Sequence, residues 1–296
     1  MHEDQLQVTA GIVAELIAEQ FPEWSRLPIT RVQPEGTVNA IFRIGDHLAA
    51  RLPLQPGDTG RARARLRTEA AAARRLADAT SVPVPVPLAI GEPGGRYPMP
   101  WSVQTWLTGV TANVDDPGDS ETFASELAGF ILDVRAIDTE GRTFDGTNRG
   151  GDLRFDEGWM AYCFEQSHGL VDVPRLRRLW GRLRDLPRRA PDVMTHGDLI
   201  PGNVLVRHGR LAGILDVGGL APADPALDLV AGWHLLEPGP RRRLRRELGC
   251  DDLEWERGKA WALQQAMGAA WYYRRSNPEM HTMGFRTLER ILADES

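Results

Sequence analysis

Lysine is almost absent from this sequence: Lys259 is the only one among 35 basic residues in a chain of 296. Cysteine is nearly as rare, since Cys163 and Cys250 stand alone and neither belongs to a CxxC or Cys/His cluster. Two cysteines cannot form a disulfide framework. We therefore predict that both are buried free thiols, as is usual for cysteines without a redox or metal partner.

Long apolar runs are also missing. No stretch of about 18 apolar residues occurs, which excludes a membrane-spanning helix. The start of the chain, Met1-His2-Glu3-Asp4, lacks the basic residues and apolar stretch of a secretory signal. Hydrophobic residues make up 42% and charged residues 26% of the chain, the balance of a soluble globular protein. We expect a cytoplasmic protein without a membrane partner.

Excess positive charge is lacking as well, because the net charge is −6. A general nucleic-acid binder needs a basic face to neutralise phosphates, so no nucleic-acid partner is expected. All of the net charge falls in residues 106–296. Such an acidic part favours a cationic small molecule, although helical surfaces rich in Asp and Glu explain it equally well.

The length of the chain predicts two lobes rather than one core. In the first third of the chain, apolar residues at helical spacing predict helices over 5–20 and 60–79. Short β-like runs predict strands over 29–32, 39–44, 47–52, 86–90 and 101–106. After a polar hinge over 107–120, helices are expected over 123–137, 157–167, 175–186, 226–236, 254–273 and 285–293. The fold class is α+β. We expect a small lobe over 1–106, with a helix and a five-stranded antiparallel sheet, and a larger helical lobe over 107–296.

A β-rich island, 193–215, interrupts the second half. Two apolar strands over 203–207 and 211–215 are joined by His208-Gly209-Arg210. Because a hairpin returns the chain beside its start, the loop 196–203 and Asp216 should meet at one end of the pair. Asp198, Asn203 and Asp216 then converge, and such oxygen ligands suit Mg²⁺ bound to phosphates.

The same segment carries a family resemblance. Three motifs follow one another here: His196-Gly-Asp-Leu-Ile-Pro-Gly-Asn203, then Asp216-Val-Gly 18 residues after Asp198, and then Asp224-Pro-Ala-Leu-Asp228-Leu. Together they resemble the motifs of the aminoglycoside phosphotransferase family, a relative of the protein kinases. The resemblance implies a bilobal protein-kinase-like fold and an ATP-dependent (or GTP-dependent) phosphotransferase. It makes Asp198 the catalytic base and Asn203 and Asp216 the Mg²⁺ ligands. Asp228 is expected to anchor the catalytic loop, and His196 to be a buried structural histidine.

The resemblance also assigns a nucleotide side, where this sequence departs from the family. Arg51 stands where the family has lysine, paired in the family with a glutamate that corresponds to Glu69. Arginine keeps the charge and can chelate phosphate. The phosphate loop offers one glycine, Gly36. The remaining nucleotide contacts are expected from the side chain of Gln104, the carbonyl of Thr105 and the amide of Leu107.

The sequence says less about which residues bind the acceptor. Acidic candidates are Asp156, Glu157 and Glu237, with Asp152 and Glu165 as further carboxylates. Aromatic residues are plentiful, and one or two of them, Trp271 among them, are expected to stack on a sugar or macrocycle. Most members of this group are expected in the core; besides Trp271 it contains Trp159, Tyr162, Trp233, Trp261, Tyr272 and Tyr273.

Three hypotheses about the acceptor stay open. The first is a kinase of an aminoglycoside-type or other antibiotic, and the second is a metabolic kinase of a sugar or amino alcohol. The third is a non-catalytic nucleotide-binding pseudokinase, which Arg51 and the single loop glycine favour and which the intact Asp198, Asn203 and Asp216 oppose. A protein kinase is disfavoured, because Asp224 follows Asp216 too closely for a long activation segment. The chain is expected to be a monomer or a homodimer.

Overall fold

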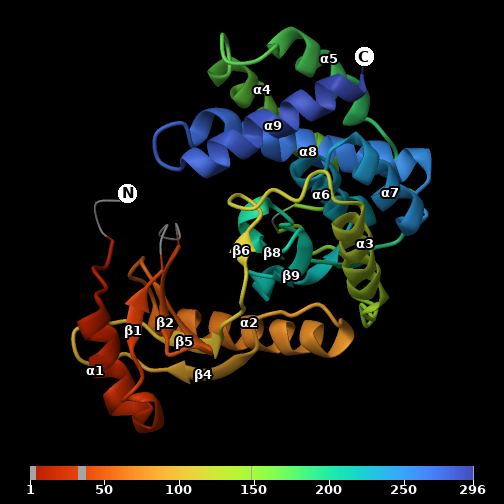
Figure 1. The fold of residues 1–296 in the computed structure, drawn as a ribbon. Helices are drawn as coiled ribbons and strands as arrows, with labels where there is room; N and C mark the ends of the chain where they lie inside the picture. The colour runs from red at the N-terminus through yellow and green to blue at the C-terminus, as the bar shows by residue number, and fades with distance from the viewer. Residues whose placement is uncertain (1–4, 33–37, 148, 296) are drawn as a thin grey trace. The chain divides into compact units, whose positions relative to one another are not determined.

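The computed structural model describes residues 5–32, 38–147 and 149–295, and the chain divides into two compact units. Unit 1 comprises Met1–Asp78 and Pro83–Thr108, and unit 2 comprises Ala79–Val82 and Gly109–Ser296 (Figure 1).

Unit 1 is built on a five-stranded antiparallel sheet with the order β1-β2-β3-β5-β4. Its strands are β1 (Ile29–Arg31), β2 (Asn39–Ile44), β3 (Leu48–Pro53), β4 (Pro87–Gly91) and β5 (Trp101–Thr105). Side chains alternate across β2, so that Ala40, Phe42 and Ile44 are all buried. The alternation gives the sheet one continuous apolar face.

Helix α1 (Ala10–Gln20) covers that face, with Val13, Leu16 and Ile17 packed in one core with the buried side chains of β2. The short helix η1 (Pro22–Trp24) follows it. Helix α2 (Thr59–Ala79) runs alongside β4 and is tied to it by polar contacts (Figure 1). Arg63 forms an ion pair with Glu92, and the Arg74 guanidinium donates to the Pro87 carbonyl at 3.1 Å.

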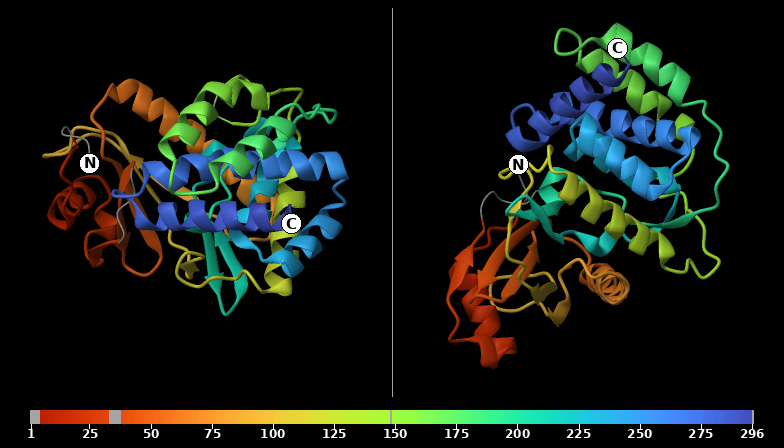
Figure 2. Two further views of the ribbon diagram at one scale, coloured as in Figure 1. Left: turned by 90° about the horizontal axis from the view of Figure 1, so that it is seen from above. Right: turned by 45° about the vertical axis from the view of Figure 1, so that its right-hand side comes forward.

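Unit 2 is mostly helical. Its helices are α3 (Glu121–Ala136), α4 (Glu157–Gln166), α5 (Val173–Leu183), α6 (Ala231–Leu235), α7 (Pro238–Leu248), α8 (Asp252–Tyr272) and α9 (Pro278–Asp294). Helix α8 is central, because α4, α5, α6 and α9 all pack against it, and it lies side by side with α9 in both views (Figures 1 and 2). Buried residues occur on every side of α8, as expected for a helix enclosed by others.

Two small sheets lie within unit 2. One has the order β6 (Val110–Thr111), β8 (Val204–Arg207), β9 (Arg210–Ile214), and the other pairs β7 (Val193–Thr195) with β10 (Ala221–Ala223). The β8–β9 hairpin turns at His208 and Gly209, which both have positive φ (54° and 69°), as a tight two-residue turn requires. Short 3₁₀ helices connect these strands to the rest: η2 (Leu153–Asp156), η3 (Pro201–Asn203), η4 (Val217–Gly219) and η5 (Pro225–Val230).

Several element predictions need correction. The first helix begins at Ala10 rather than residue 5, because the Thr9 hydroxyl accepts from Ile12 N and caps the helix there. The stretch 107–120, predicted to be a polar hinge, contains strand β6. Helix α7 was not predicted, since its Pro-Gly-Pro start and its arginines hide the apolar spacing. The helix predicted over 226–236 is a 3₁₀ helix followed by the short α6.

The cysteine prediction is correct for Cys163, which is buried and free, whereas Cys250 is free but half-buried.

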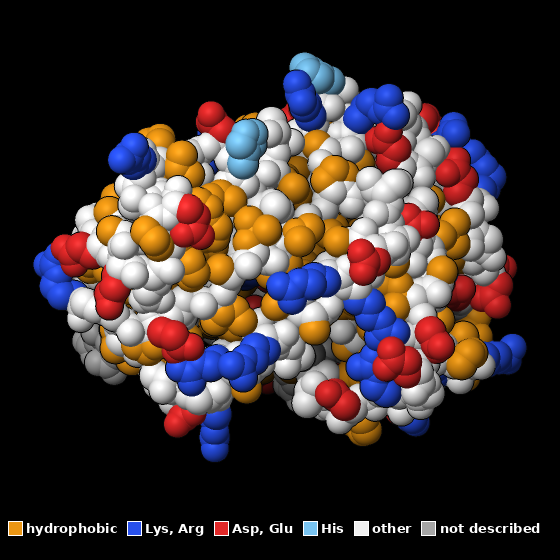
Figure 3. All heavy atoms as spheres, turned by 90° about the horizontal axis from the view of Figure 1, so that it is seen from below, with side chains coloured by type: hydrophobic (Ala, Val, Ile, Leu, Met, Phe, Trp, Pro, Cys, Tyr) orange, Lys and Arg blue, Asp and Glu red, His pale blue; other side chains and the backbone are white. Residues whose placement is uncertain are grey.

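Within residues 5–32, 38–147 and 149–295, none of the helices combines the length and apolar character needed to cross a bilayer. On the face drawn in Figure 3, arginine side chains of the described residues are interspersed with Asp and Glu.

Candidate functional site

The loop after β7, which carries Asp198, is anchored by a buried carboxylate. Both oxygens of Asp228 accept hydrogen bonds, from the amides of His196 and Gly197, at 2.8 Å each. The His196 ring is 1% exposed, and its Nε2 lies 3.0 Å from the Leu215 carbonyl. The predicted hydrogen bonds from Asp228 to the loop are present, and His196 is buried, as predicted. The two residues fix the loop to η5 and to the end of β9.

Asp198 and Asn203 lie together at the end of this loop. Asn203 Nδ2 donates to Asp198 Oδ2 at 2.8 Å and to the Asp198 carbonyl at 3.0 Å. The Asn203 carbonyl accepts from Leu215 N at 2.7 Å, which holds it beside the residue that precedes Asp216. Asp216 is exposed and adopts the left-handed conformation (φ 53°, ψ 51°), which is uncommon for a residue other than glycine. The hairpin thus places the three side chains at one end of unit 2.

A residue that the sequence did not reveal, Arg149, faces the same carboxylate. Its Nη1 lies 3.5 Å from Asp198 Oδ1. The backbone next to it is held in place at Gly150, which has φ +110° and whose carbonyl accepts from Asp224 N at 3.0 Å. A Cβ at position 150 would come within 2.5 Å of Ala223 Cβ, so only glycine fits there. Arg149 lies in an irregular segment without a motif, which left no signal for sequence analysis to find.

Two opposing effects act on the pKa of Asp198. Burial of the carboxylate raises this pKa above its usual range, and the charge of Asp216 acts in the same direction. The charges of Arg149 and His196 and the hydrogen bond from Asn203 lower it, and the net shift is upward. Because 40% of the Asp198 side chain is exposed, solvent limits the shift. A raised pKa suits a carboxylate that accepts a proton near neutral pH.

The candidate ligands Asn203 and Asp216 suit Mg²⁺ better than they suit a metal ion that is coordinated by protein side chains alone. In the described part of the chain, no group of three or more His, Cys, Asp and Glu side chains is placed to hold a metal ion. Asn203 and Asp216 are a smaller set, and the Asn203 amide directs its nitrogen to Asp198, which leaves its Oδ1 as a ligand. Mg²⁺ is commonly held by one or two such side chains together with phosphates and water.

The predicted nucleotide residues lie in unit 1. Arg51 is half-buried on β3, opposite Ile41 of β2 and Ser102 of β5. Glu69 lies on α2, and its carboxylate accepts from Arg65 Nε at 2.7 Å.

Gln104 and Thr105 form the end of β5, and Leu107 follows it. Thr105 N donates to the Val86 carbonyl at 2.9 Å, whereas Trp106 N donates to the His47 carbonyl at 2.7 Å. The backbone therefore still alternates like a strand just before Leu107. Gly36, the predicted phosphate-loop glycine, lies outside the described residues.

The predicted acceptor residues have different surroundings. Asp156 accepts from Gln264 at 3.1 Å, and burial raises its pKa. Glu157 binds Arg184 and the Trp180 indole, and these partners lower its pKa. Glu237 accepts from Arg290 at 2.7 and 3.0 Å. Trp271 contacts the rings of Trp159, Tyr162 and Tyr272. The charge of Arg149 acts on the pKa of Asp156 and lowers it, against the larger effect of burial.

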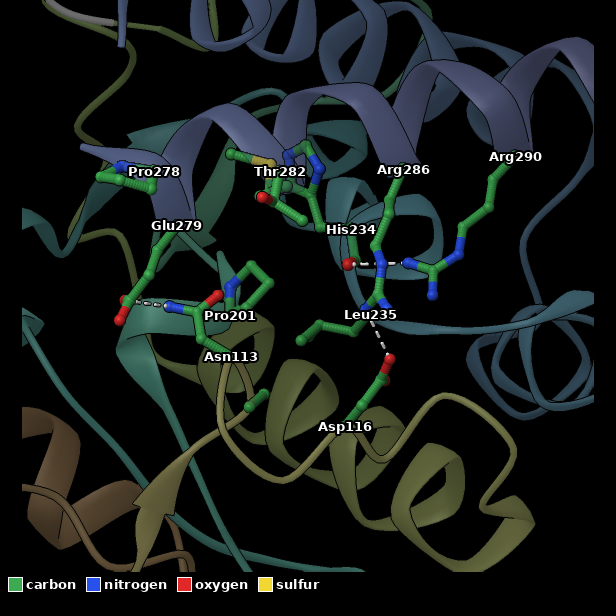
Figure 4. Close-up of a pocket in the computed structure, with 12 residues that line it drawn as sticks. Asn113, Asp116, Pro201, His234, Leu235, Pro278, Glu279, Thr282, Arg286 and Arg290 are labelled. Atoms are coloured by element: carbon green, nitrogen blue, oxygen red, sulfur yellow. Dashed lines mark hydrogen bonds and ion pairs between the residues drawn. The ribbon is translucent and has the colours of Figure 1, made fainter. Parts of the chain in front are cut away.

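A pocket of about 210 Å³ adjoins the loop at Pro201 (Figure 4). Charged side chains that line it already have partners: Glu279 accepts from Asn113 at 2.9 Å, and Asp116 accepts from Arg286 at 2.8 Å. His234 lies at its back with both ring nitrogens bonded, and burial lowers its pKa to about 4. The pocket is therefore lined by groups that satisfy one another.

Comparison with known proteins defines the family. The model of the phosphotransferase enzyme family, APH, matches residues 30–277, so the chain belongs to that family. An aminoglycoside 3'-phosphotransferase of Escherichia coli is 33% identical over 168 residues, a match that covers 51% of this chain. The chain spans 59% of the length of that relative.

Solved structures show the fold. An aminoglycoside 2'-phosphotransferase-IIIa in complex with GDP superposes with a TM-score of 0.69 at 19% identity, over 98% of this chain and 100% of that one. A macrolide 2'-phosphotransferase from Brachybacterium faecium superposes with a TM-score of 0.62 at 17% identity, over 94% and 97% of the two chains. The predicted α+β, bilobal, kinase-like fold class is confirmed.

Proposed function

We propose that this protein transfers the γ-phosphate of ATP or GTP to a hydroxyl of a small molecule of the antibiotic type. The observation that carries the proposal is the arrangement of Asp198, Asn203 and Asp216 on one anchored loop and hairpin. Family membership supports it. Relatives named as aminoglycoside and macrolide phosphotransferases support an antibiotic as the acceptor.

Asp198 is the base in this proposal. Its Oδ2 is held by Asn203, so Oδ1 is the oxygen that takes the proton of the acceptor hydroxyl. As that proton leaves, the hydroxyl oxygen bonds to the γ-phosphorus, and the bond from the γ-phosphorus to the bridging oxygen breaks, releasing the nucleoside diphosphate. The raised pKa of Asp198 makes it a better proton acceptor than an ordinary aspartate.

Asn203 and Asp216 are the residues that would hold Mg²⁺. When bound, the ion neutralises charge on the phosphates. Asp216 follows the hairpin with a left-handed backbone and is exposed, which suits this role.

In unit 1, Arg51 is proposed to bind the phosphates, with Glu69, Gln104, Thr105 and Leu107 as the other nucleotide residues. Arg51 is half-buried on β3, a central strand that pairs with β2 on one side and β5 on the other. A planar guanidinium can bind two phosphate oxygens at once, so arginine can serve in place of lysine.

An acceptor screen tests the function. Purified protein is incubated with ATP, Mg²⁺ and a panel of aminoglycosides, macrolides, sugars and amino alcohols, and nucleoside diphosphate and phosphorylated product are measured. We expect product with at least one antibiotic and none with Asp198→Ala. The exposed Asp119→Asn is the matched control and should behave as the wild type. Efficient turnover of a sugar or amino alcohol alone would establish a metabolic kinase instead, and no turnover with any acceptor would contradict the proposal.

A further inference from the structure

Five aromatic side chains form a continuous row at the end of α8. The row consists of Trp159, Tyr162, Trp271, Tyr272 and Tyr273. Neighbouring ring centroids are 5.0–6.2 Å apart, within the range of direct ring contact. The members from Trp159 to Trp271 bridge α4 and α8, so the row is a product of packing rather than of one amphipathic helix.

The row is fixed but open to solvent. The Trp159 ring rests on the α8 backbone at Gly268, where an added Cβ would approach its Cζ2 to 3.1 Å. Even so, Trp159 is 41% exposed, Tyr162 47% and Tyr272 56%, in contrast to Trp233 and Trp261, which are 0% and 1% exposed. Large aromatic surfaces held rigidly in water are characteristic of binding sites rather than of a core.

The row leads to the proposed base. Tyr273 contacts the Tyr272 ring at 5.0 Å, and the chain after it continues to Pro278 and Glu279, which line one pocket with Pro201 of the loop that carries Asp198. Arg149 in turn lies 3.5 Å from Asp198. An acceptor whose hydroxyl reaches Asp198 Oδ1 therefore has Arg149 beside it, and we expect the remainder of a bulky acceptor to extend toward the aromatic row.

The charges at this place oppose a polycation. Arg149 pairs with Asp198 and so offsets the negative charge of the carboxylate at the reacting oxygen, and two exposed arginines, Arg274 and Arg275, follow Tyr273 directly. Two nearby carboxylates already have partners: Asp156 accepts a hydrogen bond from Gln264, and Glu157 is bound by Arg184. An ammonium group near Arg149 would be repelled, whereas an apolar ring or lactone face would gain contact with the row.

We infer that the acceptor is a bulky alcohol with a largely apolar face and at most one positive charge, and that the aromatic row binds that face. This inference rests on the proposed function, since it describes the acceptor side of the same site. Tyr272 is the specificity-determining residue to test, because it is the most exposed member of the row and its removal disturbs the core least.

The test measures binding separately from turnover. In the Asp198→Asn background, calorimetry compares erythromycin, a macrolide with one amine, with kanamycin, an aminoglycoside with several. We expect erythromycin to bind more tightly, and Tyr272→Ala to weaken that binding roughly three- to tenfold, as loss of one aromatic contact implies. Tyr272→Phe should restore it. Phe155→Ala, which removes an aromatic side chain that is 85% exposed and outside the row, should leave it unchanged.

Tighter binding of kanamycin, failure of erythromycin to bind, or equal effects of Tyr272→Ala and Phe155→Ala would overturn the inference. Efficient phosphorylation of kanamycin with Tyr272→Ala unaffected would overturn it while the proposed function stands. The expected binding pattern without turnover by the wild type would instead count against the function and leave the recognition of an apolar acceptor intact.

Discussion

Asn203 Nδ2 donates to both the side chain and the backbone carbonyl of Asp198, at 2.8 and 3.0 Å. One amide therefore fixes the rotamer of the proposed base and also closes the loop on itself. The same amide leaves its oxygen free to bind a cation. In the proposed function, positioning the base and holding Mg²⁺ would thus both depend on Asn203.

Asn203→Ala should impair both roles. The Mg²⁺ concentration for half-maximal rate is expected to rise roughly tenfold or more, because one of few protein ligands is lost, and kcat should fall because Asp198 loses its holding partner. A Mg²⁺ titration of the initial rate measures the first effect. Asn203→Asp, which keeps an oxygen ligand but removes the donor to Asp198, should retain more Mg²⁺ affinity than Asn203→Ala. An unchanged Mg²⁺ titration in both variants would remove Asn203 from the metal site.

Arg149 should control the pH dependence of the reaction. The base works deprotonated, so kcat/KM falls as the pH drops through the pKa of Asp198, and Arg149 holds that pKa down. Removing the positive charge in Arg149→Gln raises the pKa further, which moves the acidic limb of the profile to higher pH. Arg149→Lys keeps a positive charge and should leave the limb near its wild-type position. A limb that stays in place or moves to lower pH in Arg149→Gln would refute the effect.

We expect Asp228 to contribute to the stability of the folded protein as well as to the proposed reaction. In Asp228→Asn, one side-chain oxygen becomes an NH₂ group that faces the amide of His196 or Gly197, and a buried donor loses its acceptor. We expect a loss of about 1–3 kcal/mol in the free energy of unfolding. Urea denaturation of the variant against the wild type measures it. Asp185→Asn, at a side chain that is 62% exposed, should change stability by less than about 0.5 kcal/mol. Equal stabilities of Asp228→Asn and Asp185→Asn would show that the anchor contributes little.

Arg51 should matter for the nucleotide alone. Arg51→Ala is expected to raise the KM for ATP about tenfold, the lower end of the range for a hydrogen bond to a charged group. Arg51→Lys should lie between, because an ammonium makes a single-point contact where a guanidinium can make two. Steady-state kinetics with ATP and with GTP, at saturating acceptor, provide the values. Arg43→Ala, at an arginine of the neighbouring strand that pairs with Asp46, is the control. A KM for nucleotide that does not change in Arg51→Ala would move the phosphate contact elsewhere in the chain.

The sequence by itself determined the strand pattern of unit 1, the β8–β9 hairpin and the segment from His196 to Asp228. These features depend on local rules: alternation of apolar residues, a two-residue turn, and motifs within about thirty positions of each other. It also predicted that Asp228 holds the loop, since that role follows from the motif. The sequence did not predict helix α7, because its proline-rich start and its many arginines weaken the helical spacing of apolar residues.

Only the tertiary structure decided what surrounds Asp198. Arg149 lies 49 positions before Asp198 in an irregular segment, and it reaches the carboxylate because Gly150 fits against Ala223. The aromatic row joins Trp159 of α4 to Tyr273 after α8, and neither helix carries a spacing that distinguishes these rings from core residues. Which aromatic residues remain exposed depends on how α4 packs on α8, and that packing sums contacts between residues more than a hundred positions apart. Local patterns therefore determined the proposed phosphate-transfer residues, and long-range packing decided the proposed acceptor surface.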